Sequence, residues 1–115
     1  MELDHNGLNT AISANILPEV RMRELGFTDH LETTWYYNTR VGNGVSFNVS
    51  IPKDGSRLRI DVLDEDFLQP YDYQMFLEKT PNLAFALGVK AGVEFQMETL
   101  SKAGVITGYS KGMYI

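Results

Sequence analysis

Four carboxylates gather at one point of the chain and are its best candidates for chemistry: Asp61, Asp64, Glu65 and Asp66. They follow a predicted strand, and carboxylate oxygens are the ligands that Mg²⁺ and Ca²⁺ prefer. Their spacing lacks the alternating ligands, central glycine and distal glutamate of an EF-hand loop. A solvated loop whose acids cap the helix that follows explains the same residues without a metal. We favour this structural interpretation and expect no metal or other cofactor, with a divalent-metal-dependent hydrolase or nuclease as the alternative.

Other residue types that carry catalysis are absent from the sequence or badly placed in it. The chain has no cysteine, which excludes a thiol nucleophile, a disulfide and a thiolate metal site. His5 and His30 are the two histidines, and no spacing joins them to a zinc-binding set. Ser46 and Ser50 lie on a predicted strand outside any Gly-x-Ser-x-Gly turn, and residues 42–44 are too short for a phosphate loop. These residues predict no catalytic centre.

Charge and hydropathy narrow the class of partner. The 115 residues carry 15 acids and 10 bases, for a formal net charge of −5, and the pI is about 4.9. Nucleic-acid binding rests on clustered Lys and Arg, whereas the bases here are scattered and residues 61–78 hold six acids and no base. No stretch approaches the roughly 20 apolar residues of a membrane span. The acidic start at residues 1–7 is unlike an export signal, so we expect a cytoplasmic protein that binds neither nucleic acid nor membrane.

Alternation of apolar and polar residues predicts an antiparallel β-meander of three strands. Residues 33–39 are rich in β-branched and aromatic side chains, which favour a strand. Val45–Ile51 and Arg57–Val62 alternate in hydropathy, and turns rich in glycine separate the three segments. The apolar positions of the second and third strands then share one face: Val45, Phe47, Val49, Ile51, Leu58, Ile60 and Val62.

Helical periodicity follows the meander. A long helix is predicted over residues 81–102, opened by Pro81 and closed by Gly104, with an apolar stripe that would cover the sheet. Shorter helices are expected at residues 8–15, 18–25 and 69–80. The predicted fold is therefore a single α+β domain, residues 1–115, in which the long C-terminal helix packs on one face of a three-stranded antiparallel β-meander. Residues 1–17 are expected to be a loosely attached segment.

Two surfaces are candidates for binding a protein. Each glycine inside a helix costs about 1 kcal/mol relative to alanine, so Gly88 and Gly92 need a reason for their small size. Either the helix presses on its own sheet, or one set of residues, the helix stripe, contacts a second subunit: Phe85, Gly88, Val89, Gly92 and Phe95. The outer sheet face is the second surface, with Asn48, Arg57 and Arg59. Antiparallel sheets often leave a polar face in solvent without a function.

Three segments together resemble small uncharacterised proteins of Gram-positive bacteria and their phages: Phe47–Ile51, Leu63–Gln74 and Val93–Met97. The resemblance spans residues 18–108 and implies a bacterial or mobile-element origin. It brings no assigned activity and no site residue.

Together these features predict a non-enzymatic protein-interaction or accessory module, of bacterial or phage origin, that associates as a homodimer. It would present its acidic loop or its outer sheet face to a protein partner that the sequence does not identify. An acidic mimic of nucleic acid is a third and weaker interpretation, since six acids over residues 61–78 are few for such mimicry.

Overall fold

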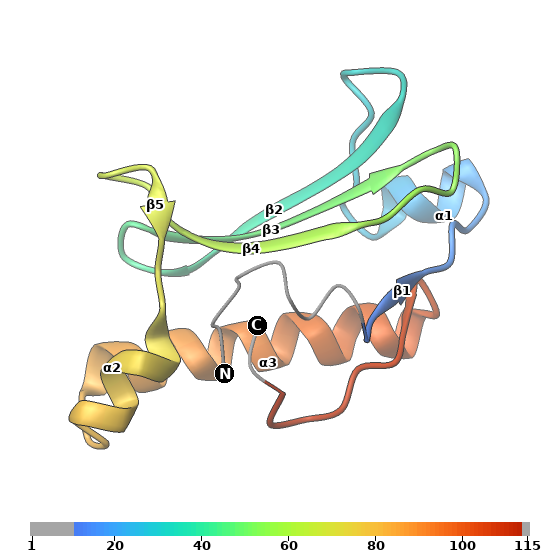
Figure 1. Ribbon diagram of the computed structural model, residues 1–115. Coiled ribbons are helices and arrows are strands. Elements are labelled where there is room, and N and C mark those ends of the chain that lie inside the picture. Colours follow the sequence, from blue (N-terminus) through green and yellow to red (C-terminus); the bar gives the residue numbers. More distant parts are fainter. Residues whose placement is uncertain (1–10, 114–115) are drawn as a thin grey trace.

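The computed structural model describes residues 11–113 and has two layers, a sheet above a long helix (Figure 1). The larger sheet is antiparallel with strand order β2-β3-β4-β5, and a second sheet pairs β1 with β6. In chain order the elements are β1 (Ser13–Ala14), α1 (Glu19–Glu24), β2 (Thr34–Gly42), β3 (Val45–Pro52), β4 (Arg59–Asp64), β5 (Gln69–Pro70), α2 (Tyr73–Lys79), α3 (Ala84–Ala103) and β6 (Ile106–Thr107).

The core lies between the larger sheet and α3. All the apolar strand positions predicted from alternation are at most 3% exposed: Val45, Phe47, Val49, Ile51, Leu58, Ile60 and Val62. The buried side of α3 carries Ala86, Val89, Val93, Met97 and Leu100, and both sets belong to one hydrophobic cluster. Burial of one such large side chain contributes about 1.5–3 kcal/mol. The predicted packing of a long C-terminal helix on the sheet is therefore confirmed.

The prediction of a three-stranded meander is wrong, because the sheet has a fourth strand. The chain turns back after β4, and Gln69–Pro70 pairs with the end of that strand as β5. Pro70 is compatible with this position, since one side of an edge strand needs no hydrogen-bond donor. The helix expected over residues 69–80 consequently begins later, at Tyr73.

Two aspartates fix the hairpin and the helix after it. The Asp64 carboxylate accepts hydrogen bonds from the N–H groups of Asp66 at 2.9 Å and Phe67 at 3.3 Å, which holds the turn between β4 and β5. The Asp72 carboxylate accepts the N–H of Met75 at 3.0 Å and caps α2. The expectation that the acids of residues 64–66 cap this helix is therefore wrong, because a strand intervenes and Asp72 does so instead.

The long helix begins later than expected and ends as predicted. The Leu83 N–H donates to the Thr80 carbonyl at 3.0 Å, so residues 80–83 form a turn and Thr80 ends α2 rather than capping α3. At the other end Gly104 has a φ of 85° and its N–H donates to the Leu100 and Ser101 carbonyls. Within residues 11–113, neither α3 nor any other helix is long and apolar enough to cross a membrane.

The chain before α1 forms a strand rather than a helix. Ser13–Ala14 pairs with β6 and Ile12 is buried, so the helix expected over residues 8–15 is wrong at residues 13–14. Residues 1–10, which hold the start of that helix and much of the segment expected to be loosely attached, lie outside the described residues. The helix expected at residues 18–25 is present as α1.

A charged clasp joins α1 to the sheet across Trp35. The Asp29 carboxylate accepts hydrogen bonds from Arg23 and Lys53, each at 2.9 Å. The Arg23 guanidinium lies 5.2 Å and the Lys53 ammonium 4.6 Å from the centre of the Trp35 ring, within reach of a cation–π interaction. The hydrogen bond from Lys53, and after it the one from Arg23, stabilise the ionised carboxylate and hold the pKa of Asp29 below its ordinary value.

Candidate functional site

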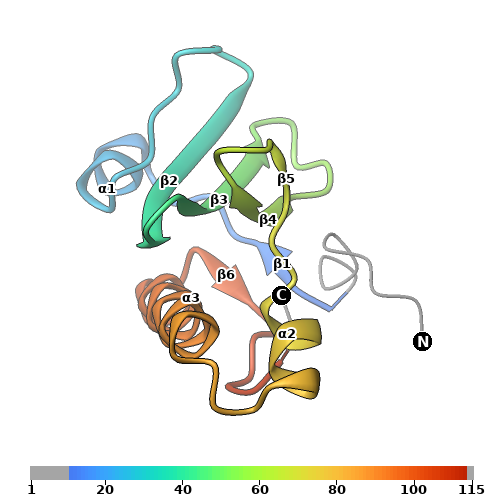
Figure 2. The ribbon, with the colours of Figure 1, turned by 90° about the vertical axis from the view of Figure 1, so that its left-hand side faces the viewer.

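Exposed apolar side chains gather at one end of the molecule. Seven of them come from the β4–β5 hairpin, from α2 and from the start of α3: Phe67, Leu68, Met75, Phe76, Leu83, Phe85 and Leu87. These elements lie at the left in Figure 1 and face the viewer in Figure 2. We call this surface the apolar end. Residues 67–87 contain three charged side chains, Asp72, Glu78 and Lys79, and the acids Glu65 and Asp66 share the hairpin turn with Phe67 and Leu68.

Tyr71 joins the parts of the apolar end. Its ring lies 5.2 Å from the ring of Phe76 in α2 and 5.8 Å from the ring of Phe85 in α3, the second pair meeting edge to face. Its N–H donates to the Val62 carbonyl at 2.9 Å and ties the segment after β5 to the sheet. Burial raises the pKa of the Tyr71 hydroxyl, and the charge of Asp64 adds to this effect. Aromatic groups from both helices thus meet at the sheet edge.

The β4–β5 hairpin holds two apolar side chains in solvent. Phe67 is 76% exposed and Leu68 is 78% exposed. Leu68 has a φ of 52° and is the one non-glycine residue within residues 11–113 in the left-handed region. This conformation costs a leucine about 1–2 kcal/mol, and such strain concentrates at functional sites. The strained turn therefore holds its two apolar side chains in solvent rather than in the core.

The structure does not bring the four acids into one site. Each has its own local contact: Asp61 with Arg59 at 3.6 Å, Asp64 with the hairpin main chain, Glu65 with Arg40 at 3.4 Å, and Asp66 beside Gly44. In the part of the chain that the structure describes, no group of three or more His, Asp or Glu side chains is placed to hold a metal ion. The arrangement therefore gives the acids electrostatic and turn-forming roles.

The helix stripe is divided between core and surface. Val89 is fully buried, and a Cβ added at Gly92 would lie 3.0 Å from a side chain of β2. Gly92 is therefore small because α3 presses on its own sheet. A Cβ added at Gly88 would meet nothing within 4 Å, and Phe95 is 65% exposed. Phe85 belongs to the apolar end, so the five residues do not form one continuous surface.

The outer sheet face satisfies several of its own polar groups. Asn48 accepts a hydrogen bond from Asn38 of β2 and donates one to Ser46 at 3.0 Å. Arg59 is engaged with the acid next to it on the face, as described above. Arg57 lies outside the sheet, in the segment before β4, and forms no ion pair within residues 11–113. The structure therefore separates Arg57 from the other two residues proposed for this face.

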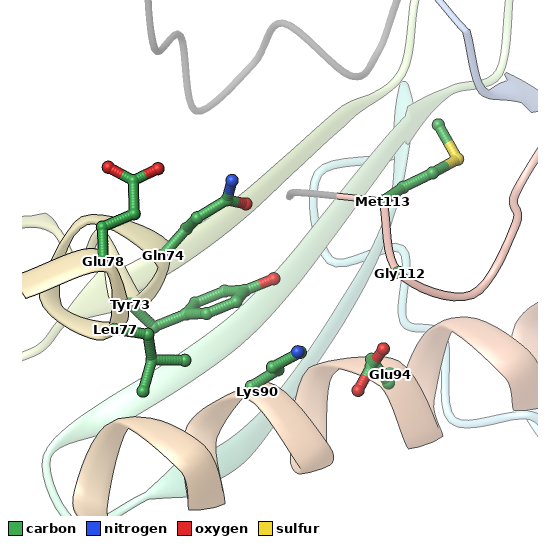
Figure 3. Close-up of a pocket in the computed structure, with 8 residues that line it drawn as sticks. All are labelled: Tyr73, Gln74, Leu77, Glu78, Lys90, Glu94, Gly112 and Met113. Carbon is green, nitrogen blue, oxygen red and sulfur yellow. The ribbon is translucent and has the colours of Figure 1, made fainter. Parts of the chain in front are cut away.

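A hollow of about 290 Å³ adjoins the apolar end beneath α2. Its lining comes from α2, α3 and the chain near residue 113: Tyr73, Gln74, Leu77, Glu78, Lys90, Glu94, Gly112 and Met113. In Figure 3 the Tyr73 side chain extends across the hollow, and Lys90 and Glu94 reach it from α3. The volume is near the lower limit of ligand sites, which span about 300–1,000 Å³. The hollow gives the apolar end a polar margin with charges of both signs.

Sequence patterns missed most of the apolar end. Of its seven residues, only Phe85 was named for an interaction surface. The available signal was density, because residues 67–87 hold more large apolar groups than one face of α2 and of the first turns of α3 can bury. The exposed pair at the hairpin tip had no such signal, since leucine is unfavourable in the left-handed conformation that the turn uses.

Comparisons with known proteins bear on the fold. No protein-family model matches the chain, and no curated protein matches it. The structure is similar to that of a DUF1831 family protein from Lactobacillus plantarum, with a TM-score of 0.62, 8% sequence identity, and coverage of 83% of this chain and 82% of that one. At this identity the likeness shows the fold alone. Its Gram-positive source agrees with the expected resemblance to uncharacterised bacterial proteins, and the expected link to phages finds no support.

Proposed function

We propose that the protein is a non-enzymatic interaction module that associates with a second copy of itself through the apolar end. The observation that carries the proposal is the gathering of seven exposed apolar side chains at one end of the molecule. Monomeric proteins rarely expose a contiguous apolar patch of more than a few hundred Å². A strained hairpin that adds Phe67 and Leu68 to the patch supports a binding role for it.

The size of the patch fits what a dimer needs. With about 200 Å² for a fully exposed aromatic residue, the exposed fractions of Phe67, Phe76 and Phe85 correspond to about 300 Å². The four aliphatic members of the apolar end contribute a similar area. A standard interface takes about 800 Å² from each partner, so the apolar end supplies most of one side.

Charge favours a second copy as the occupant. The chain has a net charge of −5, and like charges brought together at an interface cost several kcal/mol. Contacts at the apolar end limit this cost. The carboxylate of Asp72 is already engaged as the cap of α2, and Glu65, which shares the hairpin turn with Phe67, is paired with Arg40 at 3.4 Å. Two copies related by a two-fold axis can therefore pack this surface against itself.

Sedimentation equilibrium at low and high micromolar concentration tests the proposal. We expect the wild-type chain to dimerise and the double variant Phe67→Ser, Leu68→Ser to remain monomeric. The matched control is Val20→Ser, Leu31→Ser, which alters two side chains that are exposed elsewhere, at 73% and 63%, and we expect it to dimerise like wild type. A wild-type chain that stays monomeric at high micromolar concentration, or equal association of both double variants, overturns the proposal.

We do not propose a metal-dependent hydrolase or nuclease. The four acids expected to form its centre make separate contacts in the structure, and no observation favours that function over the interaction module.

A further inference from the structure

A groove of about 330 Å³ lies between β1 and the segment that connects β3 to β4. Three of the residues that line it are apolar and at most 2% exposed: Ile12, Ile51 and Leu58. All of residues 12–16 and 55–58 line it as well. β1 and this connection lie to the right in Figure 1, away from the apolar end. The groove is therefore separate from the surface proposed for self-association.

The β1 side of the groove is a strand edge that pairs with no other described strand. In the antiparallel pair of β1 and β6, Ser13 lies opposite Thr107 and Ala14 opposite Ile106. The Asn15 N–H donates to the Val105 carbonyl at 2.8 Å. Since antiparallel ladders alternate bonded and non-bonded pairs, Ser13 and Asn15 direct their main-chain groups toward β6, and Ala14 directs its own away. No described residue provides a hydrogen-bond partner for the Ala14 N–H or carbonyl.

The opposite side of the groove is formed by residues 55–58, which precede β4. Ser50 of β3 pairs with Arg59, the first residue of β4, so the chain before Arg59 leaves the sheet. This segment supplies Arg57, which is exposed and, unlike Arg59, has no ion-pair partner within residues 11–113. A guanidinium at the margin of this groove, with no ion-pair partner among residues 11–113, is suited to a carboxylate of a partner.

We propose that this groove binds an extended peptide segment of a partner protein, which adds as a strand to the free edge of β1 and pairs an acidic side chain with Arg57. Strand addition draws affinity from main-chain hydrogen bonds and specificity from pockets for alternate side chains. The outward N–H and carbonyl of Ala14 supply the first, and Ile16, which lines the groove and is 38% exposed, offers apolar contact for the second. The volume is that of a small ligand site, so the peptide contact is short.

Selection from a displayed library of random seven-residue peptides on the full-length chain supplies the probe. We expect the enriched peptides to alternate apolar residues and to contain an acid. Their affinity is measured with labelled synthetic copies by fluorescence anisotropy. Arg57→Gln should weaken binding about tenfold, which is the loss expected for a removed charged hydrogen bond, whereas the matched variant Arg59→Gln should leave affinity unchanged.

Main-chain pairing is tested on both partners. N-methylation along the peptide should abolish binding at every second position, because alternate N–H groups face β1. Ala14→Pro removes the outward N–H of β1 but leaves Ser13 and Asn15, whose main-chain groups bond to β6. The variant should therefore weaken peptide binding at least tenfold without changing the circular dichroism spectrum. If this variant does not fold, the methylation series decides alone.

Several results overturn the inference: no enriched peptide, an affinity that Arg57→Gln leaves unchanged, or sensitivity to methylation without a period of two. The variant Phe67→Ser, Leu68→Ser should bind the peptide with wild-type affinity. Failure of self-association therefore leaves the peptide site unaffected, and failure of peptide binding leaves self-association unaffected.

Discussion

Replacement of Gly88 and of Gly92 by alanine, one at a time, separates two reasons for a glycine in α3. Alanine is favoured over glycine inside a helix by about 1 kcal/mol, so both substitutions start from the same gain. At Gly88 the new Cβ meets nothing within 4 Å. We expect Gly88→Ala to raise the free energy of unfolding by about 0.5–1 kcal/mol and Tm by about 2–6 °C in a domain of this size.

At Gly92 the same gain is opposed by contact with β2. The new Cβ would lie 3.0 Å from Val41 Cβ and 3.3 Å from Val41 Cα, and the second atom is main chain that cannot turn aside as a side chain can. Overpacking of this kind costs about 1–3 kcal/mol. We therefore expect Gly92→Ala to lower the free energy of unfolding by up to about 2 kcal/mol once the helix propensity is counted.

Urea unfolding followed by far-ultraviolet circular dichroism measures both changes, with wild type and variants at one low micromolar concentration. Equal stabilisation by the two alanines would refute the view that α3 presses on β2 at Gly92. Sedimentation of Gly88→Ala provides a second readout. If the variant is stable but associates less than wild type, the surface around Gly88 rather than the apolar end forms the contact between copies.

Three further substitutions test the charged clasp, the cap of α2 and the hairpin tip. The pKa of Asp29 is held below its ordinary value of 3.8, mainly by Lys53, so the contribution of its carboxylate to stability is present at neutral pH and is lost as the pH falls below about 4. The free energy of unfolding in urea should therefore change less between pH 7 and pH 3 for Asp29→Asn than for wild type. Equal changes in the two proteins would contradict this. Asp72→Ala removes the helix cap and should lower the free energy of unfolding by about 1 kcal/mol in thermal unfolding. The exposed control Asp66→Ala should change the free energy of unfolding by less than about 0.5 kcal/mol. Leu68→Gly should raise the free energy of unfolding by about 0.5 kcal/mol, because relief of the left-handed strain outweighs the greater entropy of glycine in the unfolded chain. The variant should also dimerise less, and an unchanged dissociation constant in sedimentation would argue against the hairpin as a contact.

The parts of the fold that could be predicted are those where one local pattern dominates. Strict alternation placed Val45 to Val62 on the correct face because a shift of one residue would have exposed the whole set. Gly104 marked the end of α3 because its left-handed conformation suits glycine. β5 could not be predicted, since it depends on a carboxylate that accepts main-chain N–H groups and on a leucine in a conformation that its type disfavours.

The exposure of individual residues at the apolar end could not be predicted for a different reason. Whether Phe76 or Phe85 lies in the core or in solvent depends on how α2 and α3 meet. Tyr71 contacts both rings there from a position before α2, whereas the helix expected over residues 69–80 included it. Sequence periodicity describes one element at a time. The exposure of a side chain where the β4–β5 hairpin, α2 and α3 meet depends on how these three elements are arranged, which periodicity does not describe.

The pairing of β1 with β6 has a consequence for the order of folding. The Asn15 side chain donates to the Gly104 carbonyl at 2.9 Å, across 89 positions of sequence. The adjoining turn is so close that a Cβ on Gly108 would collide with the Ala11 carbonyl oxygen. Contacts of such long range are formed after local ones, because the loop that they close costs more entropy. On the ribosome β1 must wait until residues 106–107 have been synthesised, so a nascent protein acquires this strand edge after the larger sheet has been made.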